Sequence, residues 1–91
     1  MTSEIKSALF ASIAKRYHAR HHHLLESITL KKKTAKLRIY LEQHHLILAE
    51  SVPGIQHASI PYHVIIARVN LMEPDSVDKV FTSIDDWFAR Q

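Results

Sequence analysis

Histidine is the residue type that most directly suggests chemistry in this chain, because eight of its 91 residues are histidine. His18 and His22 are four residues apart, the spacing that places two imidazoles on one side of a helix in helical zinc sites. No glutamate lies between them in an HExxH arrangement, and no third ligand follows at a fixed offset. We therefore interpret both as polar surface residues and expect no metal and no other cofactor.

The other residues with catalytic potential form no recognisable active site. His44 and His45 fall where a turn is expected, and His63 lies in an apolar run, where a core or interface histidine is expected. Gly54 is the only glycine, so the chain has no glycine-rich phosphate loop. The adjacent acids Asp85 and Asp86 are expected on the solvated side of a helix. The sequence therefore predicts a protein that is not an enzyme and has no small-molecule substrate.

The basic residues form one clear charge run. Its members are Lys31, Lys32, Lys33, Lys36 and Arg38. In a strand over 34–41, Lys36, Arg38 and Tyr40 share one face, and cations beside an aromatic ring are typical of contact with a phosphate backbone. No helix-turn-helix, zinc finger or pair of RNA-binding aromatic residues accompanies them. Two interpretations stay open, which are nucleic-acid contact by the five basic residues and a solvated or protein-facing strand surface.

A strand and a helix in the last third of the chain organise the expected fold. The segment 60–71 is apolar on both faces, which predicts a strand with neighbours on both sides. The helix that follows has apolar residues at helical spacing, with Asp75 as its expected N-cap and Asp78 near the positive end of its dipole. Its apolar residues are Val77, Val80, Phe81, Ile84 and Phe88, with Trp87 beside them. We expect Phe88 to pack with Phe81, Ile84 and the strand.

The first half of the chain is less clearly defined. An amphipathic helix is expected from Ser3 to about Ser27, although 18–33 is open between helix and loop. Alternation predicts a strand over 34–41, and 46–49 is then a second strand. A helix over 34–49 is the alternative, but it directs Ile39 and Leu46 away from the apolar side. The turn between the two strands has no Gly, Asn or Asp, which disfavours a tight hairpin.

These elements predict a single α+β domain over residues 1–91. It has an N-terminal helix, a three-stranded antiparallel sheet and a C-terminal helix packed on the sheet. The chain has no cysteine and no apolar run approaching the ~20 residues of a membrane span, so we expect a cytoplasmic protein without membrane contact. Residues 1–46 carry a net charge of +6 and residues 47–91 a net charge of −3. Such a chain can attract polyanions, or copies of itself from head to tail.

The last two thirds of the chain resemble a known family. The residues that carry the likeness are 36–41 (KLRIYL), 45–49 (HLILA), 62–66 (YHVII), Asp75 and 84–91 (IDDWFARQ). This pattern over 34–91 resembles the tail completion proteins of contractile-tailed phages. The resemblance implies a structural protein that caps the tail tube as a ring and meets head-connector proteins, first in the host cytoplasm and then in the virion. The chain departs from the family at His44 and His45, where a glycine is usual. It also ends at Gln91, beyond which the family continues, so a trimmed relative, a minimal relative and a coincidental likeness all stay open.

A self-associating assembly protein is therefore our leading hypothesis, and a small nucleic-acid-binding or regulatory module is the alternative. The basic strand face of one subunit is expected to meet the acidic start of the last helix of the next. Opposed charges at a rim set register, and apolar side chains must supply burial. The predicted interface residues are Lys36, Arg38, Tyr40, Leu46, Tyr62, Asp75 and Asp78.

Overall fold

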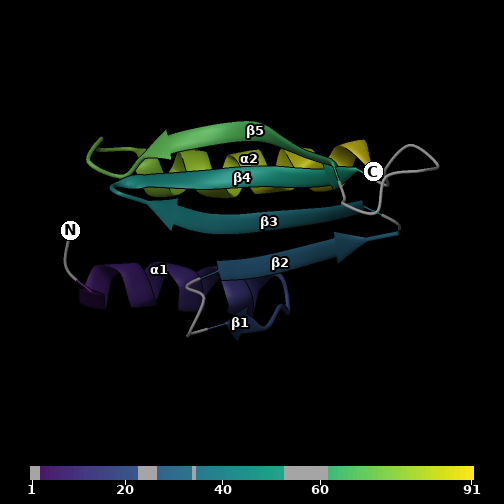
Figure 1. Cartoon of the computed structure of the whole chain (residues 1–91). Coiled ribbons are helices and arrows are strands. Elements are labelled where there is room, and N and C mark those ends of the chain that lie inside the picture. The colour runs from purple at the N-terminus through teal and green to yellow at the C-terminus, as the bar shows by residue number, and fades with distance from the viewer. Residues whose placement is uncertain (1–2, 23–26, 34, 53–61) are drawn as a thin grey trace.

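The computed structural model describes residues 3–22, 27–33, 35–52 and 62–91, which form two helices and one antiparallel sheet (Figure 1). The elements are α1 (Ser3–Arg16), β1 (His21–His22), β2 (Ser27–Lys32), β3 (Ala35–Glu42), β4 (His45–Val52), β5 (Tyr62–Asn70) and α2 (Ser76–Arg90). The strands lie in the order β1-β2-β3-β4-β5, so each pairs with its neighbours in sequence. The α+β class is confirmed. The expected three-stranded sheet is wrong, because four long strands and the two-residue β1 make up the sheet.

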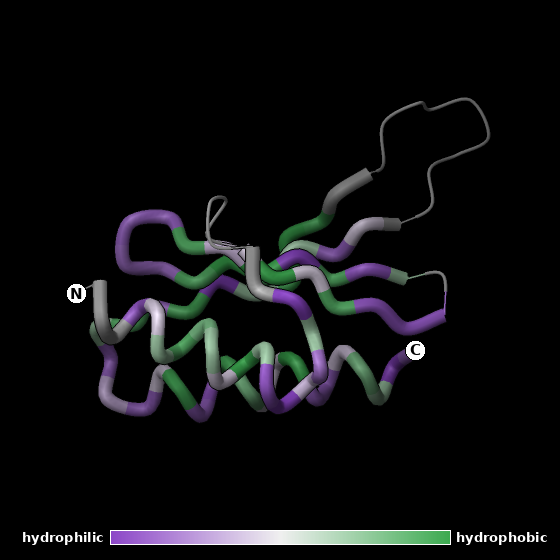
Figure 2. The backbone as a smooth tube through the Cα atoms, turned by 90° about the horizontal axis from the view of Figure 1, so that it is seen from below, coloured by the Kyte–Doolittle hydropathy of each residue, from purple (hydrophilic) through white to green (hydrophobic). Residues whose placement is uncertain are grey.

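Both helices lie in one layer on the same side of the sheet, and no described element covers the other side, which we call the open face (Figure 2). Alternate residues of the strands face the helices and are buried with them. The core consists of Leu9, Phe10 and Ile13 of α1; Ile28, Leu30, Leu37, Ile39, Leu46, Leu48 and Val69 of the sheet; and Val80, Ile84 and Trp87 of α2. Both helices therefore bury their apolar sides against the same face of the sheet.

Helix α1 ends at Arg16, well before the expected end near Ser27. His18 has a φ of 54°, and the Ala19 amide donates to the Ala14 carbonyl at 2.9 Å. This six-residue hydrogen bond around a left-handed residue is the Schellman arrangement that ends helices. Histidine is among the residues that tolerate this conformation better than most. The prediction of one continuous helix is therefore wrong, as is the same-side placement of His18 and His22, since His22 belongs to β1.

Strand β2 occupies a segment that was expected to be helix or loop. Ile28 and Leu30 are buried against the helices, whereas Lys31 is exposed. This alternation of apolar and polar residues was present in the sequence, but it spans few residues and directly precedes the charge run. Pairing with β3, with Ile28 opposite Ile39, fixes it as a strand.

The β3–β4 connection is a tight hairpin, contrary to our expectation. Glu42 pairs with His45, which leaves only Gln43 and His44 in the turn. Gln43 has a φ of 57°, a region that costs a non-glycine residue roughly 1–2 kcal/mol. The Leu71 amide donates to the His44 carbonyl at 2.8 Å, so the end of β5 helps to hold the turn. The hairpin over 34–49, rather than the alternative helix, is confirmed.

Strand β5 lies at one edge of the sheet, so the expectation of neighbours on both sides is wrong. Its register with β4 shifts between Leu48 and Ala49, which pair with Ala67 and Ile65 respectively. Ile66 is the extra residue of this β-bulge. The apolar run in β5 reflects partial burial against the core and an exposed edge, since Ile65 is 50% exposed.

Helix α2 begins after Asp75, but the Asp75 side chain makes no capping hydrogen bond. Instead, the Ser76 hydroxyl donates to the Leu71 carbonyl at 3.4 Å, and the Lys79 amide donates to the Asp75 carbonyl. Trp87 is fully buried, and Phe88 is partly buried beside it. Phe88 stacks on Tyr17 of α1, with ring centroids 5.5 Å apart. The expectation that Phe88 packs chiefly with Phe81, Ile84 and β5 missed this contact with α1.

Candidate interaction surface

The open face of the sheet brings together cations from three strands. In the observed register Lys31 lies beside Lys36, and Arg38 lies two residues after Lys36 on β3, on the same face. Arg68 of β5 joins this face, because Ile47 separates it from Tyr40 in one row across the strands. All four cations are exposed. We call Lys31, Lys36, Arg38 and Arg68 the basic face.

The expected projection of Lys36, Arg38 and Tyr40 from one face of a strand is confirmed. The Arg38 guanidinium lies 5.5 Å from the centroid of the Tyr40 ring, a cation–π contact. Within the described part of the chain, no acidic side chain pairs with any cation of the basic face. The sequence did not indicate Arg68 as part of this surface, because strand pairing alone brings it there.

Apolar side chains lie beneath these charges. Ile47 and Ala49 face the open side, yet Ile47 is fully buried and Ala49 is only 4% exposed. In the observed register Ile47 lies between Tyr40 and Arg68, and Ala49 lies between Arg38 and Ile65, so these longer side chains are the described neighbours that can shield them. The open face is therefore a charged layer over a small apolar centre.

Lys32 does not belong to the basic face. Its ammonium donates to the Phe88 carbonyl at 2.8 Å, near the C-terminal end of α2. A cation there satisfies a terminal carbonyl and interacts favourably with the helix dipole. Lys33 is exposed in the β2–β3 turn, with a φ of 57°. The five basic residues predicted to contact nucleic acid therefore do not form one patch. Lys32 binds the end of α2 instead of facing the partner.

The other predicted interface residues have different positions. Leu46 is fully buried in the core, so the expectation that it supplies an apolar contact is wrong. The Tyr62 side chain lies outside the described residues. Asp75 and Asp78 are exposed at the start of α2, in the helical layer, whereas Lys31, Lys36 and Arg38 project from the other side of the sheet. Arg68 lies on the edge strand and borders one hollow together with both acids.

A polar contact between the helices was missed by the sequence interpretation. The Asp85 carboxylate accepts hydrogen bonds from Arg16 at 2.9 Å and from the Tyr17 hydroxyl at 2.7 Å. Burial, and then the hydrogen bond to Asp85, raise the pKa of Tyr17 to about 12. Arg16 also lies 4.9 Å from the centroid of the Phe81 ring. Asp85, expected to be simply solvated, instead joins the end of α1 to α2.

The described histidines are dispersed. His44 and His45 are neighbours at the β3–β4 turn, with ring centroids 5.5 Å apart. His18 lies just beyond the C-terminal end of α1. The His22 and His63 side chains lie outside the described residues. Within the described ranges, no three His, Cys, Asp or Glu side chains are grouped so that they could hold a metal ion.

Comparisons with known proteins gave no relative. No family model, curated protein or solved structure matches this chain. Neither helix in the described part of the chain is long and apolar enough to cross a membrane. The surface must therefore be interpreted from its own residues.

Proposed function

We propose that this chain is a non-enzymatic assembly protein that self-associates from head to tail. In this contact, the basic face of one copy binds the acidic start of α2 of the next copy, at Asp75 and Asp78. The observation that carries the proposal is that Lys31, Lys36 and Arg38 project from the open face, whereas Asp75 and Asp78 lie in the helical layer on the other side of the sheet. Among the described residues, no ion pair joins these three cations to either acid. Repetition of such a heterologous contact gives a ring or a filament.

The nature of the basic face supports a protein partner. The exposed Ile65 lies on the same face, opposite Ala49, so docking there can bury apolar surface as well as pair charges. An apolar core with a charged rim is the usual composition of a protein interface. The resemblance over 34–91 makes a cap on a phage tail tube, in contact with head-connector proteins, the specific form of this proposal.

Charge reversal tests the contact. The purified chain should show a mass that rises with concentration beyond that of two copies in light scattering, whereas Lys36→Glu/Arg38→Glu should not exceed two copies. A matched control is Lys15→Glu/Arg20→Glu, which reverses two exposed charges at the end of α1 and beyond it. The control should associate as the parent does. A parent whose mass is independent of concentration, or a loss that is equal in both variants, contradicts the proposal.

Nucleic-acid binding is the second candidate, favoured by the four unpaired cations that the sheet gathers across three strands. Phosphate contacts release counterions, so affinity for a single-stranded oligonucleotide should fall steeply with salt. The Arg38–Tyr40 contact engages the ring that base stacking would use. Tight, salt-sensitive retention of the oligonucleotide, lost in Lys36→Glu/Arg38→Glu while the mass stays that of a monomer, would favour this candidate.

A further inference from the structure

A second surface, distinct from the basic face, lies where β5 and α2 form one edge of the molecule. No strand pairs with the outer side of β5 among the residues that the structure describes. In an antiparallel strand, every second residue directs its backbone N–H and C=O groups to the outer side. The bulge at Ile66 divides this edge into two regular stretches, Tyr62–Ile65 and Ala67–Asn70.

Two shallow hollows lie beneath this edge and meet at its middle. One is bordered by Ile66, Asp86 and Arg90, and the other by Arg68, Asp75 and Lys79. Ala67 and Ser83 border both hollows. The edge is thus recessed on both sides of a centre made of small side chains, and small residues allow close approach of another chain.

The outward side of α2 has an antisymmetric charge pattern about this centre. Thr82 and Ser83 form the middle of the stripe, Lys79 precedes them by three residues, and Asp86 follows them by three residues. Farther out, Asp75 and Arg90 are again equidistant and opposite in charge. Thr82, Lys79 and Asp86 are exposed. A helix that runs antiparallel to α2 about this centre would place Lys79 opposite Asp86 and Asp75 opposite Arg90.

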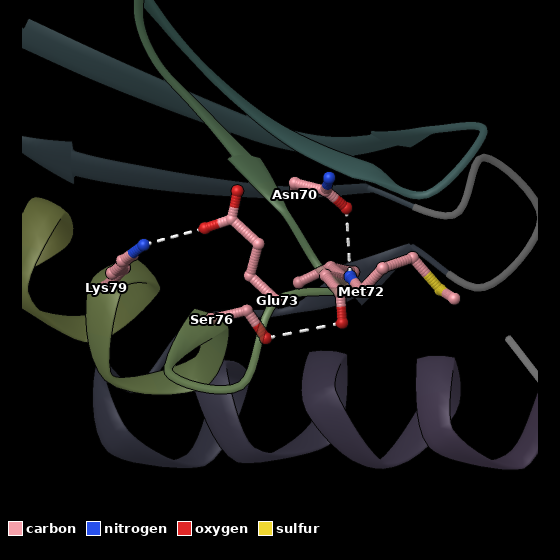
Figure 3. Close-up of polar contacts among 6 residues, drawn as sticks. Asn70, Met72, Glu73, Ser76 and Lys79 are labelled. Atoms are coloured by element: carbon pink, nitrogen blue, oxygen red, sulfur yellow. Dashed lines mark hydrogen bonds and ion pairs between the residues drawn. The ribbon is translucent and has the colours of Figure 1, made fainter.

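We propose that a second copy of this chain docks on the β5–α2 edge about a two-fold axis near Thr82 and Ser83. A two-fold contact is self-complementary, so each Lys79–Asp86 pair occurs twice. Lys79 now binds Glu73 at 2.7 Å, but both side chains are about half exposed, so this pair is readily exchanged (Figure 3). The partner is a copy of this chain because its own α2 carries the complementary order of charges.

This two-fold contact differs from the proposed head-to-tail contact in its geometry and in the number of copies it can join. A head-to-tail contact continues, whereas a two-fold contact stops at two copies. The axis passes through the edge, so the open faces of both copies lie on the same side of the joined sheets. The dimer therefore carries two basic faces side by side, which doubles the surface offered to an acidic partner.

The edge contact is best measured in the Lys36→Glu/Arg38→Glu background, where the head-to-tail contact is removed. Sedimentation should show twice the 10.5 kDa mass of the chain at high concentration. Adding Lys79→Glu or Asp86→Lys should weaken the dimer about tenfold or more, because like charges then face each other. Combining both should restore it, because the exchange recreates two opposite pairs.

A bulky substitution at the centre supplies a second test. Thr82→Arg places a long cation on the axis and should abolish the dimer. Ser7→Arg is the matched control, since it adds the same group at an exposed position of α1, and it should leave the dimer intact. Circular dichroism should show that all variants remain folded. A background protein that is monomeric throughout, a double exchange no tighter than either single change, or a dimer indifferent to Thr82→Arg would each overturn the edge contact.

Discussion

The two faces of the sheet bury apolar side chains by different means. On the covered face, Ile39 and Leu48 lie beneath two helices and contact α1 and α2 side chains within one core. On the open face, Ile47 is as fully buried, but its described neighbours on that face are the strand residues Tyr40 and Arg68. Complete burial alone does not indicate which side of a strand holds the fold together. The covered face supplies stability, and the open face leaves a charged layer available for a partner.

The largest expected effect is on the covered face, at Trp87. Trp87→Ala should lower the free energy of unfolding by ~3–5 kcal/mol, because a fully buried indole leaves a large cavity. In a small domain this approaches the whole stability. Phe88→Ala should cost clearly less, because that ring is only partly buried. Urea unfolding followed by circular dichroism measures both, and equal losses would show that the covered face does not centre on Trp87.

A matched pair of isoleucines compares the two faces directly. Ile39→Ala should cost ~2–5 kcal/mol, whereas Ile47→Ala should fall at or below about 2 kcal/mol. The flexible side chains above Ile47 can settle into the space, and helices above Ile39 cannot. Both residues are fully buried in the parent, so exposure cannot explain a difference. If urea unfolding gives the same loss for both, the open face is as much a core as the covered one.

A smaller effect is expected where α1 and α2 are joined, at Asp85. Asp85→Asn should cost no more than about 1 kcal/mol, because the carboxylate and Arg16 are each about half exposed. Asp86→Asn is the matched control at the exposed neighbouring position and should change stability even less. A loss of several kcal/mol for Asp85→Asn would show that the helical layer depends on this ion pair.

The same contact predicts a pH dependence. Tyr17 has its pKa raised from 10.0 to about 12, so the folded state holds the phenol proton more tightly than the unfolded chain does. Its stabilising contribution is therefore complete below pH 10 and is lost as the pH rises through about 12. Tyrosinate absorbance should show one late-titrating tyrosine that Tyr17→Phe removes. A parent in which all tyrosines titrate together near their ordinary pKa would contradict this.

Periodicity was sufficient to predict β5 and α2, because each has a long pattern. It favoured β3 and β4 over the alternative helix, because that helix directs Ile39 and Leu46 away from the apolar side. It failed at 17–32, where a left-handed His18 ends α1 and a short strand follows. Propensity alone does not identify a histidine in that conformation, and the alternation in β2 is brief. The same limit applied to the hairpin at Gln43, whose turn lacks the residues that usually mark one.

The candidate surface was predictable in part. Lys36, Arg38 and Tyr40 follow from alternation within one strand. Arg68 could not be foreseen, because its place beside them depends on the β4–β5 register. Lys32 and Leu46 were misassigned for a related reason. Sequence alone does not distinguish a lysine that binds a helix end, or a leucine that lies in the core, from the same residue at a surface. The distinction depends on which element packs against it.

The central claim is that the basic face binds the acidic start of α2, and the most direct test mixes two variants that each lack one of these two surfaces. Both variants carry Thr82→Arg, which removes the edge contact. Lys36→Glu/Arg38→Glu keeps the acidic start of α2, and Asp75→Asn/Asp78→Asn keeps the basic face. Native mass spectrometry should show each variant alone as a monomer. The mixture should form pairs that contain one chain of each and grow no further, since only one complementary contact remains. A mixture that stays monomeric while the parent associates would contradict binding between the basic face and the acidic start of α2.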